Sequence, residues 1–216
     1  MRATNQLRSR TGVYLIQSRK DLEFYLEADR IALGIQHPST LSQKLKFHFA
    51  EDIYKFERLL RKTEYHLNCD KSLFGKSRAA YLCYRLIRKG LKMGFEISPN
   101  CFGPGLAIAH LGTIVVHYKT RIGSNCRIHP CVVIGTQAGY SDRCPTIGRN
   151  VFIGPGAKIF GEITIADGIA IGANSVVNKS FLEPNITIAG IPARKVSNKG
   201  SKGLLADAIE ALHVEP

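Results

Sequence analysis

The side chains of this chain best suited to acid–base or nucleophilic chemistry are its histidines and cysteines. A neutral imidazole has a pKa near physiological pH, so a histidine such as His110 can serve as a general base. A lone histidine is more often structural, and we interpret His117 and His129 as structural or surface residues. The six cysteines contain no C-x2-C pair, which argues against a zinc ribbon or a redox motif. We therefore expect reduced, mostly buried thiols and no metal.

Composition limits the class of protein that these residues can serve. The 216 residues are 44% hydrophobic, enough for one large core or two modest domains, and the formal charge of +13 predicts an anionic partner. No nucleic-acid motif has its required spacing and there is no Trp, so we expect no nucleic acid. The basic N-terminus is followed by no long apolar run, which predicts a cytoplasmic protein without a membrane span.

The first part of the chain, residues 1–95, has helical periodicity. Ser18 is an N-cap candidate for a helix over 21–30, Pro38 breaks the chain, and further helices are expected over 53–65 and from about Ser77 to Met93. The second helix surrounds its apolar face with four cations, which are Lys55, Arg58, Arg61 and Lys62. We interpret such basic faces as solvated helix surface, with an anionic ligand or membrane as the alternative.

Beyond Gly94 the period changes to six. Aliphatic residues recur in two runs, namely Ile122, Ile128 and Ile134, and then Ile147, Ile153, Ile159, Ile165, Ile171 and Val177. Neither a helix nor an ordinary strand has this period, whereas a hexapeptide β-helix does, with the aliphatic pointing into a triangular prism and Gly, Asn or Asp at its corners. The sequence therefore predicts an α+β protein with a helical domain over 1–95, a parallel β-helix over 96–196 and a tail over 197–216.

The stretch 135–146 interrupts the two runs and is too long for a prism corner. It must leave the prism as a loop, and insertions in repeat proteins commonly build the binding face. The alternative is a tolerated surface insertion.

Several motifs together resemble one family over the whole chain. They are Gly103-Pro104-Gly105-Leu106-Ala107-Ile108-Ala109-His110, Gly112-Thr113-Ile114-Val115-Val116, Ile153-Gly154-Pro155-Gly156-Ala157-Lys158-Ile159, Ile171-Gly172-Ala173-Asn174-Ser175-Val176-Val177 and Ala189-Gly190-Ile191-Pro192-Ala193-Arg194. The sequence is similar to the hexapeptide-repeat acyltransferases, and most to serine O-acetyltransferases and their relatives in surface-polysaccharide loci. The resemblance implies a left-handed β-helix, an acetyl-CoA donor without a metal, and a homotrimer with active sites between adjacent prisms, which sometimes pairs with a second trimer through the helical halves.

The resemblance also implies roles for individual residues. His110 matches the general base, and Glu96 stands where the family usually has Asp, in a segment one residue shorter than its pattern, as the carboxylate that would orient the imidazole. On the acceptor side, Arg143 retains a loop arginine suited to binding a carboxylate, whereas Ala109 and Cys144 replace the family's Asp and His. Cys144 is interpreted as lining the site rather than as an acyl carrier.

Cofactor contacts are expected at small turns and at three cations. The small residues are Gly135, Thr136, Pro155, Ala157 and Ala173, and the cations that would meet the coenzyme A phosphates are Lys179, Arg194 and Lys195. Small residues are also required by the prism corners themselves.

Three functions follow as hypotheses. The first is acetyl transfer to serine, giving O-acetylserine, and the second is the same transfer to a sugar hydroxyl of a surface polysaccharide, which the Ala109 and Cys144 replacements favour. The third is a non-catalytic β-helix module that binds a partner or an anionic membrane.

Overall fold

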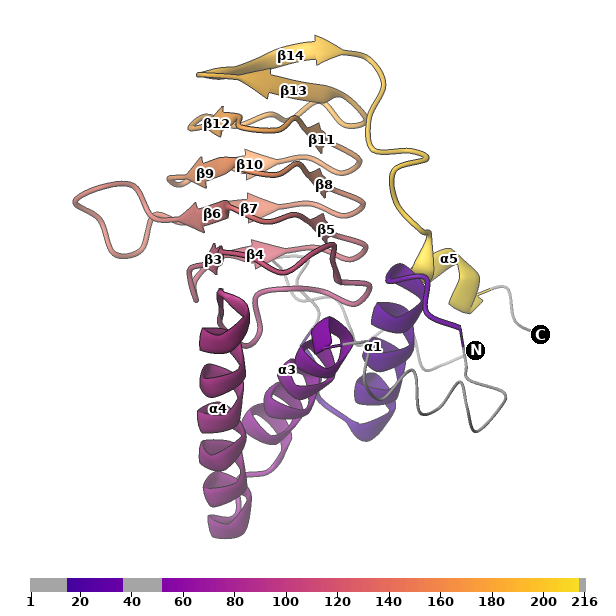
Figure 1. Ribbon diagram of the computed structural model, residues 1–216, viewed down its shortest axis with the longest axis vertical. Coiled ribbons are helices and arrows are strands. Elements are labelled where there is room, and N and C mark those ends of the chain that lie inside the picture. The colour runs from indigo at the N-terminus through magenta and orange to yellow at the C-terminus, as the bar shows by residue number, and fades with distance from the viewer. Residues whose placement is uncertain (1–14, 37–51, 214–216) are drawn as a thin grey trace.

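The protein consists of a helical part joined to a three-sided prism of short strands, seen here in a computed structural model that describes residues 15–36 and 52–213 (Figure 1). The helices are α1 (Arg19–Ala32), α3 (Asp52–Cys69), α4 (Leu73–Met93) and α5 (Ala208–His213). The expected break at Pro38 lies outside the described residues. Of the described helices, none is both long and apolar enough to cross a membrane.

The prism is the predicted left-handed parallel β-helix. Sheet A runs in the order β1-β3-β6-β9-β12, with β1 (Phe95–Ile97), β3 (Ile114–Val116), β6 (Val132–Gly135), β9 (Lys158–Phe160) and β12 (Val176–Val177). Sheet B is β10-β7-β4, with β4 (Arg121–Ile122), β7 (Thr146–Ile147) and β10 (Thr164–Ile165). Sheet C is β14-β13-β11-β8-β5-β2, with β2 (Ala107–Ile108), β5 (Arg127–Ile128), β8 (Phe152–Ile153), β11 (Ala170–Ile171), β13 (Thr187–Gly190) and β14 (Ala193–Ser197). Only β13 and β14 pair antiparallel among these strands.

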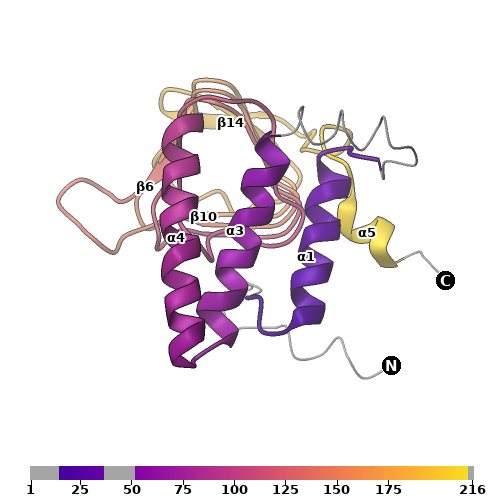
Figure 2. The ribbon, with the colours of Figure 1, turned by 60° about the horizontal axis from the view of Figure 1, so that its bottom comes forward.

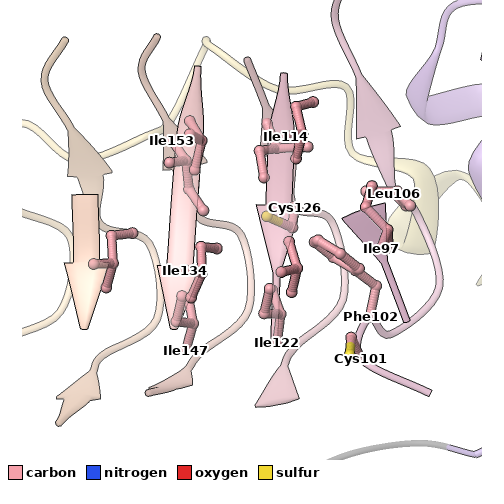
Figure 3. Close-up of a cluster of buried hydrophobic side chains, with 14 of the residues drawn as sticks. Ile97, Cys101, Phe102, Leu106, Ile114, Ile122, Cys126, Ile134, Ile147 and Ile153 are labelled. Carbon is pink, nitrogen blue, oxygen red and sulfur yellow. The ribbon is translucent and has the colours of Figure 1, made fainter. Parts of the chain in front are cut away.

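The six-residue period arises because each side of the prism contributes one inward aliphatic residue, as Ile122, Ile128 and Ile134 do on sheets B, C and A, and successive coils stack these residues on one another. Ile128 is in register with both Ile108 and Ile153, and all three side chains are buried. Figure 3 shows such inward-pointing side chains, Ile122, Ile134 and Ile147 among them, stacked inside the prism. Removal of this apolar surface from water is the main stabilisation of the prism.

The corners of the prism need backbone conformations that most residues avoid. Asn125, Asn150 and Asn174 each adopt a φ of 55°, in the left-handed region that Asn tolerates better than other residues with a Cβ. The asparagines that the sequence places at corners therefore turn the chain between sheets.

Helix α4 connects the two parts directly. Ser72 caps its N-terminus by accepting a hydrogen bond from the Gly75 N–H, and Gly94 ends it with a φ of 79°. A Cβ at Gly94 would lie 3.0 Å from the backbone of Gly112, so only glycine allows this approach. The chain then enters β1 at once, which places α4 beneath sheet A (Figure 1).

The helices cap the first coil of the prism with buried charges. Asp29 of α1 accepts hydrogen bonds from the N–H groups of Gly105 and Leu106, both at 2.9 Å, and Glu57 and Glu64 of α3 accept those of Ile108 and Asn100. These N–H groups have no preceding coil to receive them, and an unpaired buried N–H is costly. The carboxylates therefore replace the missing coil.

Arg61 balances these carboxylates, and its expected place on a solvated helix surface is wrong. Its side chain is fully buried, paired with Asp29 at 2.7 Å and Glu64 at 3.0 Å, and it donates to the carbonyl oxygens of Phe102 and Gly103. Burying several carboxylates requires such a partner, which helical periodicity alone does not reveal.

Candidate active site

Sheet A has two edges, and the predicted site residues lie on both. The turns from sheet C into sheet A, at 109–113, 129–131, 154–157 and 172–175, form what we name the histidine edge. The turns from sheet A towards sheet B, at 117–120, 136–145, 161–163 and 178–180, form the loop edge. The width of sheet A separates the two edges within one chain.

His110 stands at the first coil of the histidine edge with its side chain exposed. Its ring centre lies 6.3 Å from that of His129, one coil further along, and the His129 ring contacts Phe152 at 4.8 Å. His129 Nδ1 lies 2.9 Å from the carbonyl oxygen of Ile153, which requires the proton to be on that nitrogen. Burial lowers the pKa of His129, which favours a neutral ring beside His110.

The closeness of His129 to His110 goes beyond the interpretation of the sequence, in which His129 is structural or at the surface but could face the groove between subunits. The signal was present in the repeat, because Ile108 and Ile128 are in register and His129 therefore follows its strand as Ala109 follows β2. Pairing the coils by their inward aliphatics would have placed the two histidine-bearing turns side by side.

Glu96 lies on the outer surface of sheet A, exposed in β1 and in register with Val115. Within the described part of the chain, Glu96 and His110 share no hydrogen bond. Glu96 as the carboxylate partner of His110 stays a prediction.

The loop edge carries the other acceptor-side residues. The stretch 136–145 leaves the prism after β6, as expected, and protrudes from the molecule (Figure 1). Arg143 stacks its guanidinium 3.6 Å from the ring centre of Tyr140, and the Gln137 N–H donates to the Arg143 carbonyl oxygen. Cation–π stacking holds the guanidinium in a fixed orientation.

Cys144 lies next to a second histidine on this edge. Its Sγ is 3.0 Å from Nδ1 of His117, and burial raises the pKa of the thiol. A protonated thiol is a weak nucleophile, so this geometry supports a lining role over an acyl carrier. His117, interpreted from the sequence as structural, is thus tied to the base of the loop.

The expected cofactor residues divide between the edges in the same way. Pro155 and Ala173 are exposed on successive turns of the histidine edge, whereas Gly135, Thr136 and Lys179 lie on the loop edge or at its start. Arg194 and Lys195 are exposed in β14, at the far end of sheet C, where Lys195 pairs with Glu183.

Ala157 requires a correction. Its side chain is fully buried inside the prism, because it precedes the inward-facing Ile159 by two residues in the strand period. Its methyl group is therefore part of the core and does not line a cofactor site.

A cavity of about 290 Å³ opens beside the histidine edge, between the helices and the turn at Ala109. Most of the residues that line it are apolar, with Leu33 from the helical part and Leu111 from the prism. Asp52 lines it as well and pairs with Lys89 at 3.1 Å, and this hydrogen bond lowers the pKa of Asp52. This pocket therefore combines apolar side chains with the carboxylate of Asp52 and the ring of Tyr54. No group of three His, Cys, Asp or Glu side chains in the described ranges is placed to hold a metal.

Comparison with known proteins gives the family. No family model matches the chain, but a serine acetyltransferase of Helicobacter pylori strain J99 is 34% identical over 137 residues, which are 55% of this chain and 80% of that protein. The chain belongs to the serine acetyltransferase family. A relative from Staphylococcus xylosus is 39% identical over 126 residues, covering 56% of this chain and 58% of the relative.

Solved structures agree over a longer part of the chain. Serine acetyltransferase from Brucella abortus in complex with coenzyme A superposes with a TM-score of 0.63 at 28% identity, covering 84% of this chain and 68% of that one. The soybean enzyme in complex with serine gives 0.62 at 29% identity, covering 82% and 69%. The chain nevertheless spans only about half the length of several curated relatives that it matches, with 46% to 48% of three of them covered.

Proposed function

We propose that this protein is an O-acetyltransferase that uses acetyl-CoA as donor and the hydroxyl of L-serine as acceptor. The observation that carries the proposal is His110, an exposed imidazole beside a neutral histidine on the edge of a serine acetyltransferase β-helix. The structural relatives bound to coenzyme A and to serine support the same pair of substrates.

In the proposed mechanism His110 acts as the general base. Its neutral imidazole takes the proton of the serine hydroxyl while the hydroxyl oxygen attacks the thioester carbonyl carbon. The carbon–sulfur bond then breaks, and the leaving thiolate of coenzyme A takes the proton from the imidazolium. Neutral His129 adds no positive charge beside His110, so it does not oppose the imidazolium that forms.

The division of the site between two edges supports a homotrimer with shared sites. His110 precedes β3 and His117 follows it, so the histidine and loop edges of one chain face away from each other across sheet A. A second copy packed on sheet A would bring its loop edge, with Arg143 and Cys144, to the histidine edge of the first. Pairing of two such trimers through the helical parts remains a prediction.

The outer face of sheet A has the character of a protein interface. Its outward row contains Val115 and Val133 between the charged Glu96 and Lys158, with Val176 beyond Lys158, whereas the outward residues of sheet B are Arg121, Thr146 and Thr164. Helix α4 lies below β3 and β6 on the side from which the loop protrudes, with α3 next to it (Figures 1 and 2). The exposed side of α4 carries apolar residues at coiled-coil spacing, which are Leu73, Ala80, Tyr84, Ile87 and Leu91.

The donor and base are tested by a thiol-release assay with acetyl-CoA and serine. His110→Ala is expected to lower kcat by about 10²- to 10⁴-fold with little change in KM for acetyl-CoA, because it removes proton transfer and not binding. His66→Ala, on α3 and away from both edges of sheet A, serves as the matched control. Equal kcat for wild type and His110→Ala would reject His110 as the base.

Shared sites are tested by complementation. His110→Ala and Arg143→Ala chains, each defective alone, are coexpressed; a mixed trimer then contains sites that join an intact histidine edge to an intact loop edge. Recovered activity supports sites between chains, and light scattering should give three times the 23.8 kDa protomer mass. No recovery in verified mixed trimers would contradict them.

A sugar hydroxyl is the second candidate acceptor, and one observation favours it. The cavity beside His110 is lined by Ala109 and Asp52 and by no Lys or Arg among the described residues, so no described cation there pairs with a serine carboxylate within one chain. The same assay with nucleotide sugars in place of serine separates the two acceptors.

A further inference from the structure

The two long helices of the cap enclose an elongated groove that the acetyl-transfer site does not use. Helices α3 and α4 lie side by side (Figure 2). Two adjoining cavities of about 400 and 370 Å³ are lined by residues of both helices, with Leu59 and Arg85 common to the two. Helix α3 contributes three cations and α4 five; they are Lys55, Arg58, Lys62, Arg78, Arg85, Arg88, Lys89 and Lys92. We name this feature the basic groove.

Negative charge is scarce around these cations. Among the described residues neither cavity has an Asp or Glu in its lining, and α4 contains no acidic residue over its 21 positions. Lys89 pairs with Asp52, at the end of the groove nearest the prism. A solvated helix surface usually mixes charges of both signs, so this segregation sets the groove apart from an ordinary helix face.

The cations repel one another where they converge. Burial lowers the pKa of Lys62, and the charges of Arg58, Arg78 and Arg85 lower it further. Like charges held together in this way cost stability, and a bound anion would remove that cost.

The floor of the groove also contains an unpartnered polar atom. His66 lines the larger cavity, and its Nδ1 is buried without a hydrogen-bond partner among the described residues. The imidazole of His66 therefore lies at the wall of the larger cavity, next to the cations of α3 and α4.

Spacing and shape indicate the form of the anion. On α3 the cations stand at 55, 58 and 62, and on α4 at 78, 85 and 92, so they recur every one or two helical turns along both walls. A single phosphate would contact the cations of only one helical turn, whereas a chain of phosphates would contact those of several turns at once.

Two other polyanions, a single-stranded nucleic acid and an anionic bilayer, fit the groove less well. The guanidinium of Arg85 lies 5.8 Å from the ring centre of Tyr81, and that of Arg58 lies 5.6 Å from that of Tyr54, so rings and guanidinium groups already stack on each other instead of forming platforms for bases. A flat bilayer, for its part, would not follow a groove between two helices.

We propose that the basic groove is a binding site for an extended phosphate chain, either free or carried as the phosphates of a nucleotide. Guanidinium groups on both walls would take the phosphate oxygens by bidentate hydrogen bonds, and Lys62 would lie between them as a point charge. The site is separate from the coenzyme A contacts proposed on the prism, and it does not depend on acetyl transfer.

The test is calorimetric titration of the full-length protein with sodium tripolyphosphate, with adenosine triphosphate as a second arm. Binding is expected to weaken at least tenfold between 50 and 200 mM salt, because screening acts on every phosphate contact. Arg58→Gln/Arg85→Gln should weaken it at least tenfold, while Arg19→Gln/Lys202→Gln, with the same loss of charge at exposed sites, should leave it within about twofold.

Two further measurements separate binding from folding and identify the source of phosphate. The Arg58→Gln/Arg85→Gln protein should keep its helix content and the acetyl-transfer rate of wild type, and tripolyphosphate should raise the pKa of Lys62, followed by its reactivity with an amine reagent against pH. Tighter binding of adenosine triphosphate, lost in the same variant, would support the site and assign the phosphates to a nucleotide.

Three results would overturn the proposal. They are the absence of tripolyphosphate binding at 50 mM salt, equal weakening by the groove and control variants, and a groove-dependent binding of single-stranded DNA or phosphatidylglycerol vesicles without tripolyphosphate binding.

Discussion

The prism and the helical cap solve the same backbone problem in different ways. Inside the prism each coil donates N–H groups to carbonyl oxygens of the next, as Gly103 does to Ile122 at 2.8 Å and Ala107 to Cys126 at 2.9 Å. In the first coil, the N–H groups that face the helices donate to the side-chain oxygens of Asp29, Glu57 and Glu64 instead. Pairing between coils needs only aliphatic and turn residues, whereas capping of the first coil needs buried charges and an arginine to balance them.

The largest effect is expected where the cap balances its charges. Arg61→Ala leaves Asp29 and Glu64 buried without their cation, which should cost about 3–5 kcal/mol of the free energy of unfolding, measured by urea denaturation. Arg19→Ala, which breaks an exposed pair with Glu23, should cost less than about 1 kcal/mol. Similar losses for both variants would mean that the buried network is no more important than a surface pair.

The prism should respond to loss of volume. Ile134→Ala removes methylene and methyl groups from the sealed stack and should cost about 2–5 kcal/mol, because the neighbouring coils are held by their own hydrogen bonds and cannot collapse into the space. Thr164→Ala, outward on sheet B, is the control and should change the denaturation midpoint little. A small effect of Ile134→Ala would show that the prism relaxes more than its register suggests.

Glu57 of the cap should make stability depend on pH. Burial, and then the charge of Asp29, raise the pKa of Glu57, and its Oε2 has no hydrogen-bond partner among the described residues. A group whose pKa is higher in the folded than in the unfolded protein contributes its full stabilisation at pH values below its unfolded pKa, which is near 4.3 for Glu. This stabilisation is lost as the pH rises towards the folded pKa. Glu57→Gln cannot ionise, so the unfolding free energy of the variant relative to wild type should increase from pH 4 to pH 8.

Comparison of Glu57→Gln with wild type also controls for the titration of the other buried carboxyl group. Glu64, whose pKa burial also raises, is present in both proteins and cancels in the difference. Parallel stability curves would mean that Glu57 is not the titrating group.

The smallest effect is expected at a prism corner. Asn174 has a φ of 55°, so Asn174→Ala should cost about 1 kcal/mol, while Asn174→Gly, which tolerates that backbone, should be close to neutral. Thermal unfolding of the two variants measures the difference. Equal losses would assign the effect to the side chain instead of to the backbone.

Much of the fold could be predicted because the prism repeats. Ile122, Ile128 and Ile134 recur at six residues since each faces the same interior, and Ser18 marks the start of α1 by its local capping bond. Arg61 could not be placed in this way. On its own helix it resembles Arg58 and Lys62, and only the carboxylates of α1 and the carbonyl groups of the first coil make it a buried residue.

The same distinction between local pattern and tertiary contact applies to the candidate site. His110 and the loop after β6 were predictable from motif and period, and pairing the coils by their inward aliphatics would have placed His129 near His110. The contact of His117 with Cys144 and the burial of Ala157 were not predictable in this way, because they depend on how the loop and the turns fold onto the prism.

The sequence by itself determined the β-helix, the position of its loop and the candidate base, since these depend on local spacing that every coil repeats. Tertiary structure alone decided that the predicted site residues occupy opposite edges of sheet A, and that the cations of α3 and α4 converge on one groove while Arg61 is withdrawn into the cap. These arrangements bring together residues far apart in the chain, and no local period records which of them will meet.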